Sequence, residues 1–357
     1  MVDEQRMPHA LMLVGPEGSG QLALALALAR YLLCEAPASG EPCEQCVQCR
    51  HSARYAHPDL HFSFPTVGSK ATSDQYYSQW REAIKENPYL NVHQWLMQLN
   101  AENRQGNITR DECVHIVKKL SLKTFEGRYK ILLMWMPEYL GKEGNRLLKL
   151  IEEPPPQTLF LFVAEKAELI LGTILSRCQL IRLQPLRDED IAQALQKHLG
   201  LDGPQAHMLA QIADGNYNKA LQMAQHSTDS HSATLLDWLR KCYARRGAEL
   251  VNWSQQVATW GREPQKNFLL YGLHFWRELL AWQLSKGQAA LRLLPKEQET
   301  AKKMSQVISA PQIAAIAKLF DEAIFHIERN ANAKIVFMDL SIQLSHWMRA
   351  KSTSSVR

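Results

Sequence analysis

The sequence predicts an α/β fold with a parallel sheet, followed by a part that is helical throughout. Apolar runs of strand length at 131–135, 159–164 and 179–183 alternate with helical segments. Buried runs that alternate with helices are typical of a parallel sheet covered on both faces. A glycine-rich turn between a strand and a helix lies near the N-terminus, and amphipathic patterning fills the chain beyond residue 186.

The composition is that of an ordinary globular protein. The chain has 357 residues, enough for two or three domains, with 46% hydrophobic and 22% charged residues. The net charge of +5 is compatible with nucleic acid nearby but is too small to argue for it. No secretory signal and no apolar run of about 18 residues is visible, so we expect a cytoplasmic location and no membrane partner.

The predicted strand and helix within residues 10–33 enclose the turn Gly15-Pro-Glu-Gly-Ser-Gly20. This is the frame of a P-loop, in which backbone N–H groups and a helix N-terminus hold phosphate. Gln21 stands where a lysine should reach the phosphates, and Leu22 where a hydroxyl should hold Mg²⁺. We interpret Gly15, Gly20, Gln21 and Leu22 as a relic P-loop and do not expect productive ATP binding, which is the alternative.

Four cysteines follow the P-loop helix, with eight, two and two residues between them: Cys34, Cys43, Cys46 and Cys49. Disulfides are rare in the cytosol, and four thiolates at short spacing suit a tetrahedral Zn²⁺ site. Because catalytic zinc keeps one coordination position open, a closed set of four predicts a structural ion. Free thiols and a redox role are the alternatives.

Residues 65–105 carry no recognisable motif. Helices are expected over 75–85 and 92–100, with Trp80 and Trp95 as apolar anchors. The segment is treated as an insertion of unknown role.

The next helix is predicted to begin after Thr109, an N-cap with Glu112 at the capping-box position. Arg110 and Lys118 lie on or near its polar side. One hypothesis is a solvated polar face. The other, which follows from the family resemblance given below, is that Thr109, Arg110 or the helix N-terminus contacts nucleic-acid phosphate.

The strand over 131–135 should end in an acidic pair in an active P-loop ATPase, because these carboxylates help to hold Mg²⁺ and orient water. Trp135 and Met136 occupy those places. Glu138 is offset by two residues and is not expected to replace them. A helix is predicted over 144–152, and the prolines at 154–156 stop it.

Three features of the sequence resemble the clamp-loader branch of the AAA+ ATPases: the segment NRLLKLIEEPP, the later segment TILSRC and the cysteine module. Subunits of that branch load the sliding clamp of a replicative DNA polymerase. The resemblance covers most of the chain. It implies an AAA+ domain over 1–185 with a zinc module at 34–49, then a small helical lid over 186–228. An all-α collar domain for oligomerisation over 229–350 and a disordered tail over 351–357 complete the expected organisation.

Within the helical part of the chain, the hydrophobic pattern alone predicts where the helices and the linker lie. A polar linker is expected at 227–232. Amphipathic helices are expected after it, over 233–244, 250–260, 265–284, 310–330 and 332–348. Their aromatic residues are expected in the core or at a collar interface and not on a base-stacking platform: Phe268, Tyr271, Phe275 and Trp276.

The family's sensors are also altered. Ala164 and Glu165 stand near the first sensor, and Asn218 replaces the arginine of the second sensor in Gly215-Asn-Tyr-Asn218. The P-loop lysine, the Mg²⁺ ligands, the acidic pair and the second sensor are therefore lost together. These combined losses predict a subunit that does not hydrolyse ATP.

The triplet Ser176-Arg177-Cys178 matches the family motif. The resemblance implies that Arg177 acts in trans, with its guanidinium stabilising charge at the ATP of a neighbouring subunit. A simple ion pair is the alternative. The expected partners are gamma/tau-like ATPase and delta-like subunits of DNA polymerase III and, through the complex, the sliding clamp and primed DNA. The other functions considered are an active gamma/tau-like ATPase and a standalone DNA-binding protein.

Overall fold

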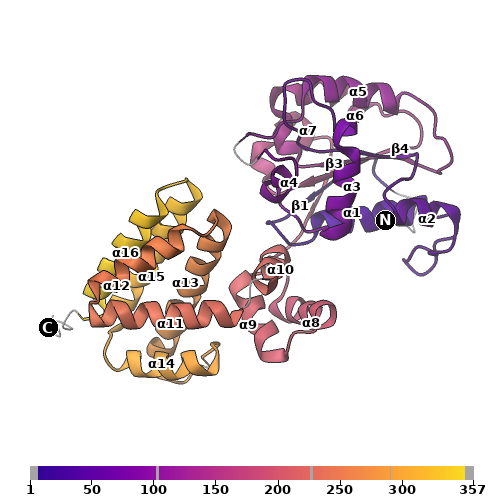
Figure 1. Cartoon of the computed structure of the whole chain (residues 1–357). Coiled ribbons are helices and arrows are strands. Elements are labelled where there is room, and N and C mark those ends of the chain that lie inside the picture. Colours follow the sequence, from indigo (N-terminus) through magenta and orange to yellow (C-terminus); the bar gives the residue numbers. More distant parts are fainter. Residues whose placement is uncertain (1–6, 102–103, 226–227, 290, 350–357) are drawn as a thin grey trace. The chain divides into compact units, whose positions relative to one another are not determined.

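The computed structural model describes residues 7–101, 104–225, 228–289 and 291–349 (Figure 1). It divides into two compact units. The N-terminal unit comprises the described residues up to Arg187 together with Gly215–Lys219. The C-terminal unit comprises Asp188–Asp214 and the described residues from Ala220 onward. Every site residue predicted from the sequence lies in the N-terminal unit.

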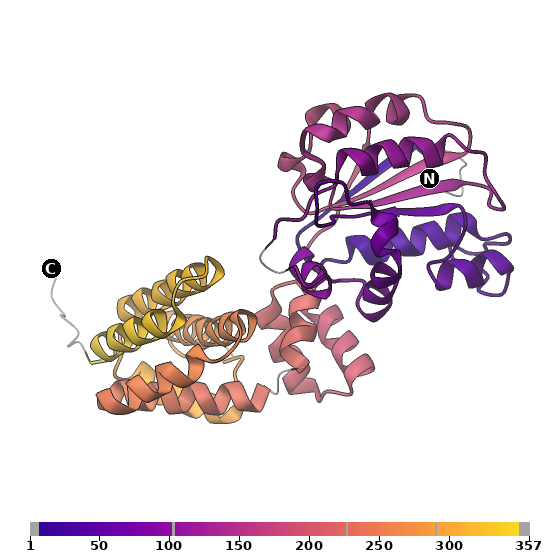
Figure 2. The ribbon, with the colours of Figure 1, turned by 45° about the horizontal axis from the view of Figure 1, so that its top comes forward.

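Five parallel strands form the sheet of the N-terminal unit in the order β2-β3-β4-β1-β5 (Figure 2). They are β1 (Ala10–Val14), β2 (Leu60–Ser63), β3 (Lys130–Trp135), β4 (Thr158–Ala164) and β5 (Gln179–Arg182). β1, β3 and β4 are buried along their whole length, as continuous apolar strands of a parallel sheet are. The predicted parallel sheet is confirmed.

Helices cover both faces of this sheet (Figure 2). They are α1 (Gln21–Leu33), α2 (Val47–Ala53), η1 (Ser73–Tyr76), α3 (Tyr77–Glu86), α4 (Val92–Gln98), α5 (Arg110–Leu120), η2 (Pro137–Leu147), α6 (Leu148–Glu152), η3 (Ala167–Leu169) and α7 (Gly172–Leu175). Neighbouring residues of a strand point to opposite faces, so Leu11 packs in one core with α1, α3 and α4. Met12 packs in the other core, with α5, η2 and α6.

The predicted α-helix over 144–152 is right in its second half, 148–152. Its first four residues, 144–147, belong to the 3₁₀-helical η2, which is interrupted at Gly141 with φ 51°. A regular α-helix is present only in α6. It ends at Glu152, and the φ of −123° and ψ of 72° of its C-cap Glu153 lie outside the α region, as expected for a residue before proline.

The C-terminal unit is helical. Its elements are α8 (Asp188–Leu199), α9 (Gly203–Ala213), most of α10 (Tyr217–Gln225), α11 (Thr228–Ala244), α12 (Gly247–Ala258), α13 (Arg262–Leu284), α14 (Pro295–Ser305), α15 (Ala310–Glu328) and α16 (Ala333–Trp347). The aromatic residues predicted for the core are fully buried, among them Phe268 and Trp276 at 0% exposure. The rings of Trp238 and Trp253 stack nearby with centroids 4.4 Å apart.

Two details differ from the sequence-based expectation in this unit. The predicted linker at 227–232 is wrong, because α11 already begins at Thr228. α14 has no counterpart among the predicted amphipathic helices. The division into AAA+ domain, lid and collar stays a prediction, and the predicted tail over 351–357 lies outside the described residues.

Candidate functional site

The loop between β1 and α1 has positive φ angles at Gly18 and Gly20, 73° and 91°, which glycine adopts without a steric penalty. The side-chain amide of Gln21 donates to the carbonyl oxygens of Gly15 and, at 2.9 Å, Pro16. Gln21 is 6% exposed. The residue at the lysine position therefore ties the loop to itself and presents no cation to a phosphate.

Apolar side chains fill the positions where a P-loop ATPase holds Mg²⁺ and its acidic pair. Leu22, Trp135 and Met136 are all buried in the same apolar core. The rings of Trp135 and Trp80 lie 5.0 Å apart between centroids. These three side chains offer no oxygen atom to a hard cation, which prefers oxygen ligands.

Two carboxyl groups lie at the edge of this region. One carboxylate oxygen of Glu138 accepts hydrogen bonds from the backbone N–H groups of Glu165, at 2.6 Å, and Lys166, at 2.8 Å. Glu138 thus holds the chain that leaves β4, and burial raises its pKa. Burial, followed by the charges of Glu17 and Glu138, raises the pKa of Glu165 to about 7.

The space left at the loop is a cavity of about 20 Å³. This is close to the volume that a single water molecule requires, and far less than a nucleotide needs. Its walls come from the loop, from the ends of β3 and β4, and from the segment after α3: Gly18, Gly20, Gln21, Leu22, Pro88, Tyr89, Leu90, Trp135, Met136, Val163, Ala164 and Glu165.

Asn218, at the position of the second sensor, is 0% exposed and is bonded within the protein. Its side-chain oxygen accepts from the Asn87 amide at 2.7 Å, and its side-chain nitrogen donates to the Gln94 side-chain oxygen at 2.8 Å. Both partners belong to the segment interpreted as an insertion. The side-chain amide of Asn218 therefore bonds to residues of the protein, whereas an arginine at the second-sensor position would contact a bound ligand.

Arg177 follows α7 and has a partly exposed side chain, at 31%. Its guanidinium pairs with the Glu152 carboxylate, at 3.2 Å between Nη2 and Oε2. Its Nη1 also donates to the carbonyl oxygen of Thr173 at 2.9 Å. An ion pair between exposed side chains contributes little to stability, so Arg177 is positioned near the surface but is not committed to this partner.

The four cysteines predicted to bind metal converge. Their sulfur atoms lie within 4.8 Å of one another, and the Sγ atoms of Cys43 and Cys49 are 3.9 Å apart. Zinc–sulfur bonds of about 2.3 Å place neighbouring sulfurs of a tetrahedron just under 4 Å apart, so the arrangement fits zinc. Cys34 and Cys49 are buried, whereas Cys43 and Cys46 are partly exposed.

Backbone N–H groups support the thiolates of this cluster. The N–H groups of Cys43, Cys46 and Cys49 donate to the sulfurs of Cys34, Cys43 and Cys46, respectively. The backbone N–H groups of Cys46 and Gln45 lower the pKa of Cys43 to about 6, because they favour its thiolate form. Cys46 also caps α2, so the cluster is built into the local helix.

The hypothesis that Thr109 contacts phosphate does not match its surroundings. Thr109 is 5% exposed, and its hydroxyl donates to the carbonyl oxygen of Ala71 at 2.8 Å. It caps α5 as predicted by accepting from the N–H of Glu112 at 3.0 Å. The Glu112 carboxylate bonds to the N–H of Ser73 at 2.9 Å and not back to the N-cap, so the predicted capping box is incomplete.

The described structure brings the relic P-loop and the positions of the lost acidic pair together around one cavity. The second-sensor residue Asn218 does not line it but bonds to Asn87, the neighbour of the lining residue Pro88. Arg177 and the cysteine cluster do not line it. Three residues at this site escaped the sequence analysis: Asn87, Tyr89 and Gln94. The sequence gives no signal for them, since their partners lie far away along the chain.

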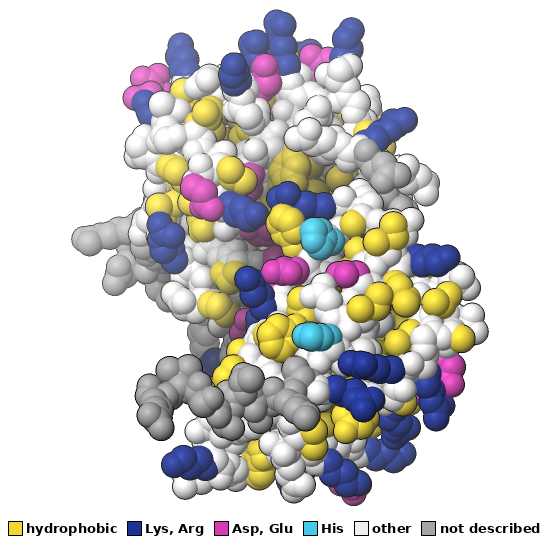
Figure 3. Space-filling view, turned by 90° about the vertical axis from the view of Figure 1, so that its left-hand side faces the viewer, with side chains coloured by type: hydrophobic (Ala, Val, Ile, Leu, Met, Phe, Trp, Pro, Cys, Tyr) yellow, Lys and Arg dark blue, Asp and Glu magenta, His cyan; other side chains and the backbone are white. Residues whose placement is uncertain are grey.

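Two surface properties bear on the wider function. Figure 3 shows one face of the molecule, on which Lys and Arg side chains are spread among hydrophobic and uncharged ones. Within the described residues, none of the helices combines the length and the apolar character needed to cross a membrane.

Comparison with known proteins gives a family match. The model of the family described as "DNA polymerase III, delta subunit" matches residues 1–187, more than half of the chain. "DNA polymerase III subunit delta'" of Bacillus subtilis (strain 168) is 25% identical over 252 residues, which cover 69% of this chain and 63% of that protein. "DNA polymerase III subunit delta'" of Escherichia coli (strain K12) is 25% identical over 220 residues, covering 61% and 54%.

A third relative carries a different subunit name. "DNA polymerase III subunit tau" of Escherichia coli (strain K12) is 25% identical over 232 residues, covering 63% of this chain and 30% of that protein. The match spans less than two thirds of the length of each of these three relatives.

Proposed function

The chain belongs to the family of DNA polymerase III delta subunits, and from this premise we propose that it is a noncatalytic, delta-prime-like subunit of a clamp loader. In this role it helps to place the sliding clamp on primed DNA. The observation that carries the noncatalytic assignment is the cavity of about 20 Å³, which leaves no room for a nucleotide at the loop. The self-bonded amide of Gln21 supports the same assignment.

Arg177 is proposed to act on the ATP of a neighbouring gamma/tau-like subunit. A guanidinium is always charged and can contact two phosphate oxygens at once. The surface position of Arg177 and its exposed partner Glu152 are compatible with an exchange of that carboxylate for a phosphate. A subunit that has lost its own ATP site can keep such an arginine, because the arginine serves the neighbour's site.

The partners proposed are gamma/tau-like and delta-like subunits, with the clamp and the primed DNA reached through the complex. The helical C-terminal unit is proposed to supply the collar through which the subunits assemble. The division proposed is an AAA+ domain to residue 185, a lid over 186–228 and a collar from 229, and the location proposed is cytoplasmic.

Cys34, Cys43, Cys46 and Cys49 are proposed to hold a structural zinc ion. The ion would stabilise the short loop and α2 by cross-linking them, and it is assigned no part in ATP chemistry. Because four sulfurs complete a tetrahedral shell, no position is left for a substrate.

ATP titration and hydrolysis test this function, first with the zinc-replete chain alone and then with candidate partner subunits. We expect no binding and no turnover by the chain alone, and an ATPase in the mixture. Arg177→Ala should lower the rate of that ATPase by about 10³-fold or more, as loss of a trans-acting arginine does. Glu152→Gln, which removes only the pairing carboxylate, is the matched control and should preserve the rate.

An active gamma/tau-like ATPase is the second candidate, favoured by the match to a subunit named tau. Mg²⁺-dependent hydrolysis by the isolated chain would establish it and refute the noncatalytic assignment. A mixture whose ATPase is indifferent to Arg177→Ala would refute the trans-acting role. Strong, salt-sensitive DNA binding by the chain alone would instead favour a standalone DNA-binding protein.

A further inference from the structure

The segment that joins β2 to α5 has contacts that the clamp-loader role does not require. We propose that this segment is an internal substitute for a nucleotide. Its residues 87–94, called the plug below, occupy the relic nucleotide site and join the loop Gly15–Gly20 to the turn Gly215–Lys219. This inference goes beyond the proposed function, because it assigns a task to a segment that carries no family motif.

The plug contacts the loop directly. The Asn91 side-chain amide donates to one carboxylate oxygen of Glu17 at 3.0 Å. The Tyr89 ring approaches so closely that a Cβ atom at Gly20 would lie 3.3 Å from its nearest carbon. Pro88, Tyr89 and Leu90 also line the cavity together with Gln21. These contacts lie where a P-loop faces its phosphates.

The same plug contacts the turn at the second-sensor position. Asn87 and Gln94 hold the buried amide of Asn218 from two sides, at 2.7 and 2.8 Å. The rings of Tyr89 and Tyr217 meet edge to face with centroids 4.8 Å apart. Tyr89 therefore lies between the loop and the turn, as a nucleotide does in an active site of this kind.

The loop and the turn also meet each other. The oxygen of Glu17 that accepts from Asn91 also accepts from the Asn216 amide, at 3.2 Å. The N–H of Tyr217 donates to the carbonyl oxygen of Gly18 at 3.1 Å. A Cβ atom at Gly18 would lie only 1.9 Å from the Asn216 side-chain oxygen, so this approach requires glycine. Loop, plug and turn thus form one closed junction.

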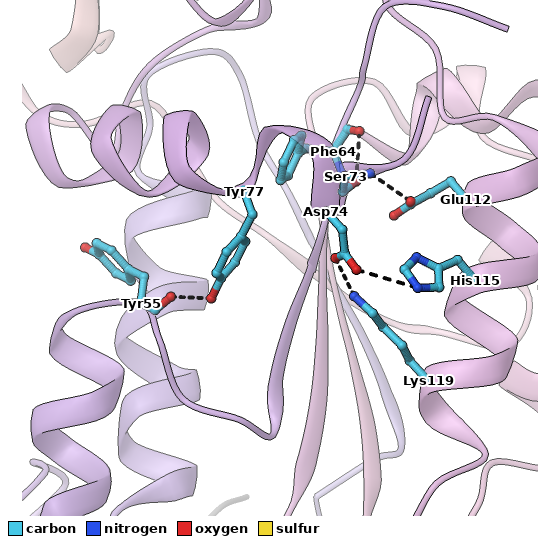
Figure 4. Close-up of polar contacts among 8 residues, drawn as sticks. All are labelled: Tyr55, Phe64, Ser73, Asp74, Tyr77, Glu112, His115 and Lys119. Carbon is cyan, nitrogen blue, oxygen red and sulfur yellow. Dashed lines mark hydrogen bonds and ion pairs between the residues drawn. The ribbon is translucent and has the colours of Figure 1, made fainter. Parts of the chain in front are cut away.

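The plug rests on a base held by hydrogen bonds, ion pairs and aromatic packing, which makes a stable substitute possible. At the start of the segment, the N–H of Ser73 bonds to Glu112, and Asp74 pairs with Lys119 and, at 3.5 Å, His115 of α5 (Figure 4). The Tyr77 hydroxyl donates to the backbone oxygen of Tyr55 at 2.5 Å.

Two fully buried tryptophans complete this base. Trp80 stacks on Phe64 with centroids 4.4 Å apart, and Trp95 meets Phe64 edge to face at 5.1 Å. The Trp95 indole N–H donates to the carbonyl oxygen of Pro65 at 2.7 Å. Because the base is already ordered, placing the plug in the site requires little further loss of conformational freedom.

Hydrogen exchange in the full-length chain tests the proposal at two amides of the turn. The N–H of Tyr217 bonds to Gly18, and that of Lys219 bonds to the Asn216 side chain. Asn87→Ala removes the bonds from Asn87 to Asn218 and to the N–H of Tyr89. We expect exchange at both reporter amides to become about tenfold faster, since the lost hydrogen bonds help to hold the turn against the loop. Tyr89→Ala should have at least the same effect.

Tyr77→Phe is the matched control, because it removes one hydrogen bond of the same segment at its anchor on Tyr55. It should leave exchange at the two amides within about twofold of the wild type. Unchanged exchange in Asn87→Ala and Tyr89→Ala would overturn the proposal. If Tyr89→Ala does not fold, the half-buried Asn87 decides the matter alone.

Nucleotide provides the second arm. Millimolar ATP should leave exchange at Tyr217 and Lys219 unchanged in the wild type, because the plug already joins the loop to the turn. Slower exchange with ATP would show that a nucleotide performs this task, and would overturn the proposal. The experiment needs neither partner subunits nor Arg177. Its result can therefore contradict the role of the plug while the trans-acting role of Arg177 holds, and the trans-acting role can fail while the role of the plug holds.

Discussion

At several positions where an active P-loop ATPase contacts ATP, this chain has side chains that form hydrogen bonds within the protein. In an active P-loop the lysine reaches out to phosphate, whereas the Gln21 amide bonds to the carbonyl oxygens of the loop that surrounds it. The side-chain amide of Asn218 likewise forms hydrogen bonds with Asn87 and Gln94. These substitutions are mutually consistent, because each replaces a contact to a ligand by a contact within the protein.

Glu165 predicts a pH dependence of stability. Burial, then Glu17 and Glu138, raises its pKa from 4.5 to about 7 in the folded chain. The folded state therefore keeps the proton that the unfolded state loses between pH 4.5 and 7, and the stability from this group falls as the pH rises through that window. We expect Glu165→Gln to stabilise the chain by about 2 kcal/mol at pH 8 and to have little effect near pH 4.5.

Urea unfolding at a series of pH values measures this difference between wild type and variant. Glu168→Gln is the control, since Glu168 is an exposed carboxyl that does not line the cavity. A stability difference for Glu165→Gln that is the same at pH 5 and pH 8 would contradict the expectation.

At the scale of elements, β3 and the segment carrying α3 and α4 depend on each other. Trp135 ends β3 and packs against Trp80 of α3, so the residue that replaces the acidic pair belongs to the same core as the insertion. Trp135→Asp would bury a carboxylate among aromatic rings and also remove their packing. We expect a loss of at least about 4 kcal/mol in the free energy of unfolding.

Denaturant unfolding measures that loss, with Trp135→Phe as the control that keeps an aromatic ring. The control should lose roughly 1–2 kcal/mol, because most of the apolar contact remains. If Trp135→Asp were no less stable than Trp135→Phe, the strand would not depend on this packing, and an acidic residue could have been kept there.

The cysteine module is an element whose stability we expect to come from metal. Cys46→Ser removes one of four ligands and also changes the cap of α2. We expect the wild type to hold one zinc ion per chain, and the variant to lose zinc far more readily to a chelator. Metal analysis and release kinetics check this, with Cys178→Ser, which lies outside the cluster, as the control.

A wild-type chain from zinc-replete medium that contains no zinc and four freely reacting thiols would refute the structural ion. Partial retention of zinc by Cys46→Ser would still agree with it, provided that release is faster than in the Cys178→Ser control.

The sequence predicts the sheet and the cysteine cluster well, because their signals are local. The apolar runs of β1, β3 and β4 and the spacing of four cysteines within sixteen positions can be read in one pass. The hydrogen bond between Asn87 and Asn218 joins residues 131 positions apart, and no local sequence pattern predicts it. α14 was missed for a different reason, since its sequence PKEQETAKKMS carries few apolar residues to mark a helical face.

At the scale of the whole molecule, the family match and the small cavity together describe a chain that has the AAA+ sheet but a cavity of only about 20 Å³ at its glycine-rich loop. The strand order β2-β3-β4-β1-β5 still brings the loop after β1 and the ends of β3 and β4 to one edge of the sheet. What fills that edge is the chain itself. A family fold whose own loop site is this small suits a subunit whose contribution lies at its surface, as proposed for Arg177.

This view leads to a last prediction, that restoring the P-loop residues does not restore an ATPase. Gln21→Lys with Leu22→Thr returns the phosphate cation and the Mg²⁺ hydroxyl. Trp135, Met136 and Asn218 would still occupy the positions of the acidic pair and the second-sensor arginine, and the cavity of about 20 Å³, which Tyr89 helps to line, would still be far smaller than a nucleotide. The lysine would also enter a space now filled by an amide that is bonded to the loop, without a phosphate to balance its charge.

We therefore expect the double variant to bind no ATP in equilibrium titration, to hydrolyse none, and to be less stable than the wild type by about 1–3 kcal/mol. Gln21→Ala is the matched control, because it removes the amide bonds without adding a charge, and it should lose less stability than the double variant. Measurable ATP affinity in the double variant would mean that only two side chains separate this chain from a nucleotide-binding subunit. ATP would then be able to displace residues 87–94 from the site. Their place in the site would be a consequence of the loss of the lysine, and not the reason why the lysine was lost.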